Sequence, residues 1–173
     1  RTALKQFVHD VYHAYLEFAL RRNYLNFGFL QLFAFVLLCE DHDLRERLGY
    51  EYVMVDEFQD SSEIQFKLML LLAGTENICV VGDWKQSIYS FQYADVDNIR
   101  EFSDRLNDFA AELNQGTARV TFPTAPIERK KLTRNYRSTQ SILDFSTKAL
   151  TAKATKSESL DKEAIAESVT PLE

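Results

Sequence analysis

The chain has 173 residues and a formal net charge of −6, with 46% hydrophobic and 27% charged residues. This composition provides enough apolar side chains for a core and excludes a wholly disordered chain. The negative charge argues against a chain-wide electrostatic contact with nucleic acid or an anionic membrane, but it permits a local basic strip. The longest apolar run, 29–39, is shorter than the roughly 18 residues of a membrane span, so we expect a cytoplasmic protein.

The first part of the chain has the spacing of helices. Apolar residues recur at three- and four-residue steps over 4–20, which predicts a first helix. Asn26 is placed to cap a second helix over 27–39, and this helix is apolar nearly all round, so we expect it to be buried. A short helical turn over 43–48, closed by Gly49, completes a helical block at 1–48.

Strands and helices alternate after this block. We expect strands at 50–55 and 77–81, and further short strands at 119–122 and 130–133. A capping box of Asp60 and Glu63 predicts a helix that ends at 73. Two later helices are expected over 96–113, capped by Asp95, and over 139–150, capped by Ser138. This alternation predicts an α/β fold with a parallel sheet and flanking helices. We expect one α/β region at 49–150 and a polar tail or linker at 151–173.

Two of the predicted strands end in polar clusters. The run Tyr50–Val55 leads into Asp56 and Glu57, and the next strand leads into Gly82-Asp83. Ligands of open parallel sheets bind beyond the carboxyl ends of the strands, where one carboxylate can hold Mg²⁺ while its neighbour polarises water. The alternative is an acidic helix N-terminus that the helix dipole favours.

Three longer motifs carry a family resemblance. They are Val55-Asp56-Glu57-Phe58-Gln59-Asp60, then Val80-Val81-Gly82-Asp83-Trp84-Lys85-Gln86-Ser87-Ile88-Tyr89-Ser90-Phe91, then Leu132-Thr133-Arg134-Asn135-Tyr136-Arg137-Ser138. In this order, with about 26 and then about 50 residues between them, they resemble motor motifs of the UvrD/Rep-type superfamily 1 DNA helicases. The form of residues 85–89 is similar to the AddA/RecB recombination branch. The resemblance covers roughly 25–150 and implies a P-loop NTPase (RecA-like) fold.

The resemblance assigns roles to the acidic motif. It implies that Asp56 holds the Mg²⁺ of Mg-ATP and that Glu57 is the general base that orients and activates the attacking water. Gln59 and Asp60 are expected to couple the site to neighbouring elements.

Three later residues complete the nucleotide site that the resemblance implies. Gln86 would sense the γ-phosphate, Tyr136 would stack on adenine, and Arg137 would be the arginine finger on the γ-phosphate. Each role suits its side chain, because a neutral amide reports a phosphate oxygen, a phenol has a π-face and a planar cation neutralises developing charge.

An aromatic series follows the second motif. Tyr89, Phe91 and Tyr93 alternate, and in the resembled family this segment contacts single-stranded DNA, so base stacking is expected, with packing between core elements as the alternative. The family commonly reads IYRFRGAD here. Ser90, Gln92 and Tyr93 therefore replace two arginines and a glycine, which puts the contacts of those cations in doubt and predicts a different local backbone at Tyr93.

The remaining polar features are less specific. Five cations gather in 129–137, as a basic strip or as solvated side chains. No zinc spacing accompanies the three histidines, and the two cysteines lie in apolar runs as free thiols; these residues are His9, His13, His42, Cys39 and Cys79.

The phosphate-binding loop G-x-x-x-x-G-K-[ST] does not occur, since none of the five glycines precedes a lysine. We therefore expect an internal fragment of an ATP-dependent DNA helicase that acts in repair or recombination, with single-stranded or duplex DNA and other repair subunits as partners. The fragment alone should lack appreciable ATPase activity. Two alternatives stay open: a non-catalytic DNA-binding module, and a metal-dependent nuclease that uses Asp56, Glu57, Asp60 and Asp83.

Overall fold

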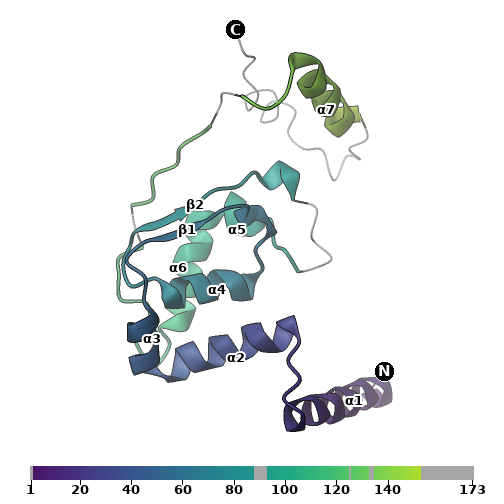
Figure 1. Cartoon of the computed structure of the whole chain (residues 1–173), viewed down its shortest axis with the longest axis vertical. Coiled ribbons are helices and arrows are strands. Elements are labelled where there is room, and N and C mark those ends of the chain that lie inside the picture. Colours follow the sequence, from purple (N-terminus) through teal and green to yellow (C-terminus); the bar gives the residue numbers. More distant parts are fainter. Residues whose placement is uncertain (1, 88–92, 125, 133–134, 153–173) are drawn as a thin grey trace. The chain divides into compact units, whose positions relative to one another are not determined.

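The computed structural model describes residues 2–87, 93–124, 126–132 and 135–152. The chain divides into two compact units, Arg1–Ile127 and Glu128–Glu173. The first unit contains the helices and strands labelled α1 to α6, β1 and β2 in Figure 1, and the second contains α7.

The N-terminal helices form where the apolar spacing predicts them. They are α1 (Thr2–Arg21), α2 (Phe27–Glu40) and α3 (His42–Leu48). Side-chain oxygens satisfy the first free amides of the two later helices: Asn26 Oδ1 accepts from Phe29 N at 2.8 Å, and Asp41 Oδ1 accepts from Leu44 N at 2.8 Å. These caps explain why the chain turns sharply between consecutive helices.

The expected burial of α2 is wrong for this chain. Only Phe29 and Leu38 on this helix are buried, whereas Phe27 is 87% exposed. The helix packs on α4 (Glu63–Leu72) through the side that carries Leu38, Phe35 and Cys39. The described residues provide no second layer for its other side, so composition predicted more burial than one neighbour can supply.

A parallel pair of strands confirms the α/β prediction. Strand β1 (Val53–Val55) pairs with β2 (Ile78–Val80) in the register Val53 to Ile78, Met54 to Cys79 and Val55 to Val80. Both are shorter than the predicted runs of 50–55 and 77–81. Helix α4 forms the crossover between them, as a parallel pair requires.

The loop after β1 begins differently from the expectation. Phe58–Asp60 form a short 3-10 helix (η1), and α4 starts only at Glu63, with Ser62 as its N-cap. Gln65 Oε1 accepts from Ser62 N at 2.8 Å and completes the capping box. The predicted box of Asp60 and Glu63 is therefore wrong, because the 3-10 turn that buries Phe58 delays the helix by two residues.

One long predicted helix is divided in two. A break at Glu101 separates α5 (Asp97–Arg100) from α6 (Phe102–Leu113), and Asp95 Oδ1 accepts from Asp97 N at 3.1 Å at the start of α5.

The strand expected over 119–122 does not form, nor does one over 130–132, the described part of 130–133. Asn114 replaces strand pairing at the first site by bonding Arg119 N at 2.7 Å and Val120 N at 2.8 Å. Helix α7 (Gln140–Ala152) agrees with the last predicted helix.

The core lies between α4, α6 and one face of the strands. Phe66 on α4 is fully buried, stacks on Phe102 at 5.3 Å between ring centroids and meets Phe109 edge-on at 5.3 Å. The inward residues of β1 and β2 pack on this cluster, whereas Met54 on the other face is 79% exposed. The helices of this core therefore support the strands from one side (Figure 1).

Candidate functional site

The two polar loops leave the strands side by side. The ladder continues past both strand ends, since Val81 N donates to Val55 O at 2.8 Å and Phe58 N donates to Val81 O at 2.9 Å. The acid loop (residues 56–62) and the second loop (residues 82–87) therefore start at the same carboxyl edge of the parallel pair. This is the edge at which open α/β sheets bind ligands.

The acid pair is exposed at this edge. Asp56 Oδ1 accepts from Glu57 N at 2.9 Å, and Asp56 Oδ2 accepts no hydrogen bond from the described residues. Glu57 has a φ of 50°, in the left-handed region, and precedes the 3-10 helix. Such a backbone costs a residue with a side chain about 1–2 kcal/mol. The reversal turns the chain so that Phe58 enters the core directly after two exposed carboxylates.

Phe58 anchors the acid loop. Its ring is almost fully buried and meets Phe66 edge-on at 5.1 Å and Phe102 edge-on at 5.6 Å. A large aromatic side chain packed between two other rings restricts the backbone of its neighbours. The position of the carboxylates therefore depends on the packing of the core.

Gln59 joins the two loops. Its buried side chain donates from Nε2 to Glu57 Oε2 at 2.7 Å and accepts at Oε1 from Asp83 N at 3.0 Å. A Cβ at Gly82 would lie 2.4 Å from Gln59 Oε1, so only glycine leaves room for this amide. Sequence reasoning expected Gln59 to couple the site to its surroundings, and it missed the matching requirement for Gly82.

Asp83 organises the loop that carries Gln86. The two Asp83 carboxylate oxygens accept from Lys85 N at 3.1 Å and from Gln86 Nε2 at 3.2 Å. Residues Trp84–Gln86 form a second 3-10 helix (η2), and the Gln86 side chain is exposed. Gln86 is thus presented on a loop that Gln59 ties to the acid loop.

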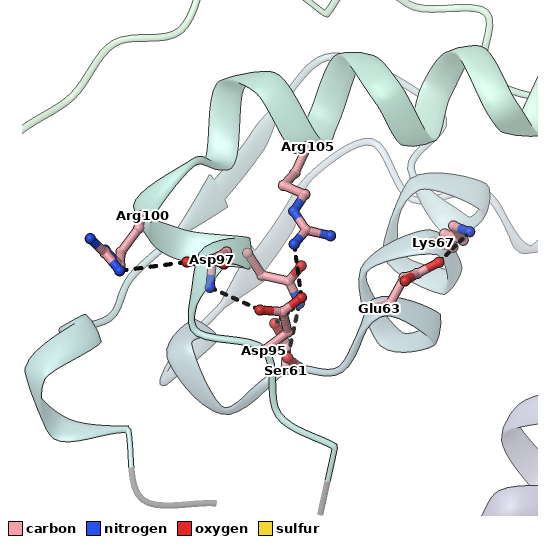
Figure 2. Close-up of polar contacts among 8 residues, drawn as sticks. Ser61, Glu63, Lys67, Asp95, Asp97, Arg100 and Arg105 are labelled. Carbon is pink, nitrogen blue, oxygen red and sulfur yellow. Dashed lines mark hydrogen bonds and ion pairs between the residues drawn. The ribbon is translucent and has the colours of Figure 1, made fainter. Parts of the chain in front are cut away.

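A second polar contact joins the acid loop to the start of α5. Ser61 O accepts from Asp95 N at 3.0 Å and from Asn98 Nδ2 at 2.9 Å, and Asn98 is fully buried. Figure 2 shows Arg105 reaching from its helix toward Asp95 beside Ser61. Sequence reasoning missed Asn98, because an asparagine in a short helix carries no local signal of a partner 37 positions away.

The arginine-finger motif has its own local order. Asn135 Oδ1 accepts from Arg137 N at 3.0 Å and from Ser138 N at 3.2 Å, which is the pattern of an Asx turn. Tyr136 and Arg137 are exposed in this turn. Both belong to the second unit, so their assignment to a common site with Asp56, Glu57 and Gln86 stays a prediction.

The basic strip is exposed where it is described. Arg129, Lys130 and Lys131 are exposed, and Lys130 pairs with Glu128. Arg134 lies outside the described residues. The choice between a basic strip and solvated cations stays open.

The aromatic series is described only at its end. Tyr89 and Phe91 lie outside the described residues, as do Ser90 and Gln92. Tyr93 is 86% exposed and has a φ of 65°, in the left-handed region that glycine adopts most readily. The backbone at Tyr93 thus has a conformation suited to glycine, and the expected difference from the family stays a prediction.

The acid pair fits a magnesium site that is completed by other oxygens. Mg²⁺ in phosphoryl-transfer sites uses one or two carboxylates plus phosphate and water oxygens, and Asp56 presents an exposed carboxylate with an open oxygen. In the part of the chain that the structure describes, no group of three or more His, Cys, Asp or Glu side chains could hold a metal ion. The four-carboxylate nuclease site therefore has no support there, and the histidines make no such group either.

The two cysteines differ in their surroundings. Both thiols are free; Cys39 is half-buried, and Cys79 is exposed on the open face of the strands. Burial raises the pKa of the Cys39 thiol, which keeps it protonated at neutral pH. The prediction of free thiols is confirmed for both cysteines, and Cys79 is exposed although it lies in an apolar run.

Comparison with known proteins decides the family. A model of the UvrD/REP helicase N-terminal domain matches residues 1–107. The chain belongs to the UvrD/Rep helicase family. It is 36% identical over 140 residues to a probable DNA helicase II homolog of Mycoplasma capricolum, a match that covers 79% of this chain and 17% of that protein. It is 34% identical over 144 residues to an ATP-dependent helicase/nuclease subunit of Lactococcus lactis, with 82% of this chain and 11% of that protein covered.

These UvrD/Rep relatives are much longer than the matched segment. The exonuclease/helicase subunit RexA of Lactococcus lactis subsp. cremoris is 40% identical over 94 residues, which is 53% of this chain and 8% of that protein. The chain therefore spans less than a fifth of the relatives it matches. None of the described helices is both long and apolar enough to cross a membrane.

Proposed function

We propose that this UvrD/Rep chain is part of an ATP-dependent DNA helicase or translocase that works in DNA repair or recombination. One observation carries the proposal: the acid loop and the loop of Gln86 leave adjacent parallel strands at one edge and share the buried amide of Gln59. The names of the relatives, which include helicases and helicase/nuclease subunits, support the same activity.

The proposed division of labour follows from the side chains. Asp56 would hold Mg²⁺, which neutralises charge on the phosphates when it is bound. Glu57 would orient the attacking water and take its proton, and its hydrogen bond from Gln59 Nε2 at 2.7 Å would keep its carboxylate in one orientation. Gln86, on the second loop, would contact the γ-phosphate through its amide.

Residues of the second unit would complete this nucleotide site. Tyr136 would stack on adenine, and Arg137 would neutralise the charge that develops on the γ-phosphate. Outside the nucleotide site, the proposed role of Tyr89, Phe91 and Tyr93 is to stack on bases of single-stranded DNA. The Asx turn of Asn135 supports the proposal for Arg137, because it orders the backbone of the residue that must be aimed.

The proposed organisation assigns 1–48 to an inserted helical subdomain, 49–150 to the second half of a RecA-like motor domain and 151–173 to a tail. The parallel pair with its α4 crossover supports a RecA-like sheet. Other repair subunits would be partners, since several relatives are named as subunits, and a cytoplasmic location stays a prediction.

Glu57→Gln tests the base role in the complete gene product that contains this chain. The amide keeps the size of the side chain but cannot accept the proton of water, so DNA-stimulated ATP hydrolysis should fall by about 10²–10⁴-fold. Binding of a fluorescent ATP analogue should change by less than about threefold, since Glu57 is not proposed to hold the phosphates.

Glu63→Gln is the matched control. It makes the same chemical change on an exposed residue of α4 and should leave the hydrolysis rate within twofold. Retained turnover in Glu57→Gln would remove Glu57 from the base role. Single-stranded DNA binding without ATP hydrolysis in the unmodified protein would instead favour the non-catalytic module.

A further inference from the structure

Two residues of the acid loop, Gln59 and Ser61, are hydrogen-bonded to the chain on either side of the aromatic series. On the near side, Gln59 O accepts from Ser87 Oγ at 3.3 Å, and Gln59 Oε1 accepts from Asp83 N at 3.0 Å. On the far side, Ser61 O accepts from Asp95 N at 3.0 Å. The acid loop is therefore bonded to Ser87, at the end of the second loop, and again to Asp95, after the aromatic series.

Asn98 strengthens the far attachment. Its Nδ2 donates to Ser61 O at 2.9 Å and lies 3.4 Å from Ser61 Oγ, and Ser61 Oγ in turn donates to Phe58 O at 2.6 Å. Arg105 of α6 holds Asp95 from the other side, with Nη2 2.9 Å from Asp95 Oδ2 (Figure 2). The far attachment is thus a connected set of polar contacts between the acid loop, α5 and α6.

The burial of Asn98 shows that this contact has a cost. The residue is fully buried, and its Oδ1 has no hydrogen-bond partner among the described residues. A buried polar oxygen without a partner is destabilising, so an apolar residue of similar size would be the better choice if the position served packing alone. The gain that offsets the cost is the Nδ2 contact with Ser61 O.

We propose that Asn98 is a positioning residue that fastens the chain beyond Tyr93, the described end of the aromatic segment, to the acid loop, so that DNA bound there acts on the alignment of Glu57. The physical path is short: Asn98 to Ser61, along the backbone to Gln59, and from Gln59 Nε2 to Glu57 Oε2 at 2.7 Å. The proposal rests on the proposed function, because it needs both the base role of Glu57 and a DNA contact in the segment. The attachment through Asn98 differs from the near attachment because it uses no residue of the second loop.

Asn98→Leu in the complete gene product tests this role. Leucine has a similar shape but no donor, so the acid loop loses its far attachment. We measure the ratio of the ATP hydrolysis rate with saturating oligo(dT) to the rate without DNA, and expect this ratio to fall at least tenfold while the KM for ATP changes less than threefold. A merely structural defect lowers the active fraction in both conditions and leaves the ratio unchanged.

Two further variants make the test decisive. Arg105→Gln weakens the same attachment at a partly exposed site that tolerates substitution, and it should lower the ratio by about threefold even if Asn98→Leu does not fold. Leu113→Val, in the same helix as Arg105 but distant in sequence from the polar contacts, controls for lost core packing and should leave the ratio within twofold.

The outcomes separate the two proposals. If the unmodified protein shows no DNA-stimulated hydrolysis, the proposed function fails and the role of Asn98 fails with it. If the unmodified protein is stimulated but every folded variant among Asn98→Leu and Arg105→Gln keeps the ratio within twofold, only the role of Asn98 is overturned.

Discussion

Helices α1 and α6 carry apolar residues at the same three- and four-residue spacing, but only α6 buries them. Leu106, Phe109 and Leu113 of α6 are buried against α4 and the strands, whereas Phe7 of α1 is 64% exposed, and Val11 and Phe18 are exposed as well. Over residues 3–21 of α1 only Ala19 is buried, although the ring of Tyr15 lies 5.9 Å from the ring of Phe29. Apolar spacing therefore determines a helix with one apolar face, and a facing element determines whether that face contributes to stability.

The same difference in burial decides which helices support the candidate site. The acid loop is fixed by Phe58, which packs on aromatic residues of α4 and α6. The aromatic cluster includes no residue of α1, and among the described residues most of the apolar side chains of α1 stay exposed. The stability of the site should therefore depend on α4 and α6 and be nearly independent of α1.

The largest expected effect is that of Phe66→Ala. Phe66 is fully buried and contacts three other aromatic rings, so its truncation should cost about 3–5 kcal/mol of unfolding free energy. Urea unfolding of the chain followed by circular dichroism measures this change. A loss below about 1 kcal/mol would show that the core of α4 and α6 is not the stabilising unit.

Lys67→Met should have a smaller effect on the same pair of helices. Lys67 Nζ lies 2.6 Å from Glu63 Oε1 and 2.7 Å from Glu112 Oε1, which connects α4 to α6 (Figure 2 shows the contact with Glu63). Methionine keeps the packing on Phe109 and loses the ion pairs, and the two carboxylates are exposed enough to regain water. The expected loss is about 1–2 kcal/mol at pH 8.

The loss caused by Lys67→Met should become smaller in base. Burial by itself lowers the pKa of Lys67, but hydrogen bonds with Glu112 and Glu63 outweigh it, so the pKa is raised above its ordinary value of 10.5. A raised pKa in the folded state stabilises the fold fully below the ordinary value, and this contribution is lost as pH rises through the folded-state pKa. Between pH 8 and pH 11, the difference in unfolding free energy between the unmodified chain and Lys67→Met should shrink. Lys5→Met on exposed α1 is the control at pH 8 and should leave the unfolding free energy nearly unchanged.

The smallest effect is expected for Phe7→Ala on α1. The side chain is mostly exposed and alanine favours helix, so the unfolding free energy of this chain should change by less than about 0.5 kcal/mol. The same substitution in the complete gene product sharpens the comparison. A loss above 1 kcal/mol there would show that residues outside this chain cover α1, and a loss of that size in the chain alone would contradict the contrast between the two helices.

Local patterns predicted the helices, the parallel strands and the place of the acid pair. Asn26 caps its helix as predicted, because a cap needs only the next few residues, and Asp56 and Glu57 follow a strand whose apolar run is visible in the sequence. The predicted burial of α2 and the strand at 119–122 failed because both depend on distant neighbours. The division at Glu101 was missed for a similar reason, since the start of α5 is held by Ser61, far back in the chain.

The sequence by itself determined which residue types follow the two strands: two carboxylates after one strand and a glutamine after the next. Only the tertiary structure decided that Gln59 reaches Asp83, that Gly82 leaves it room, and that Asn98 reaches Ser61. The reason is physical. Caps and helix faces form between residues a few positions apart, whereas these contacts join residues 24 and 37 positions apart and exist only once the core of α4 and α6 has brought the loops together.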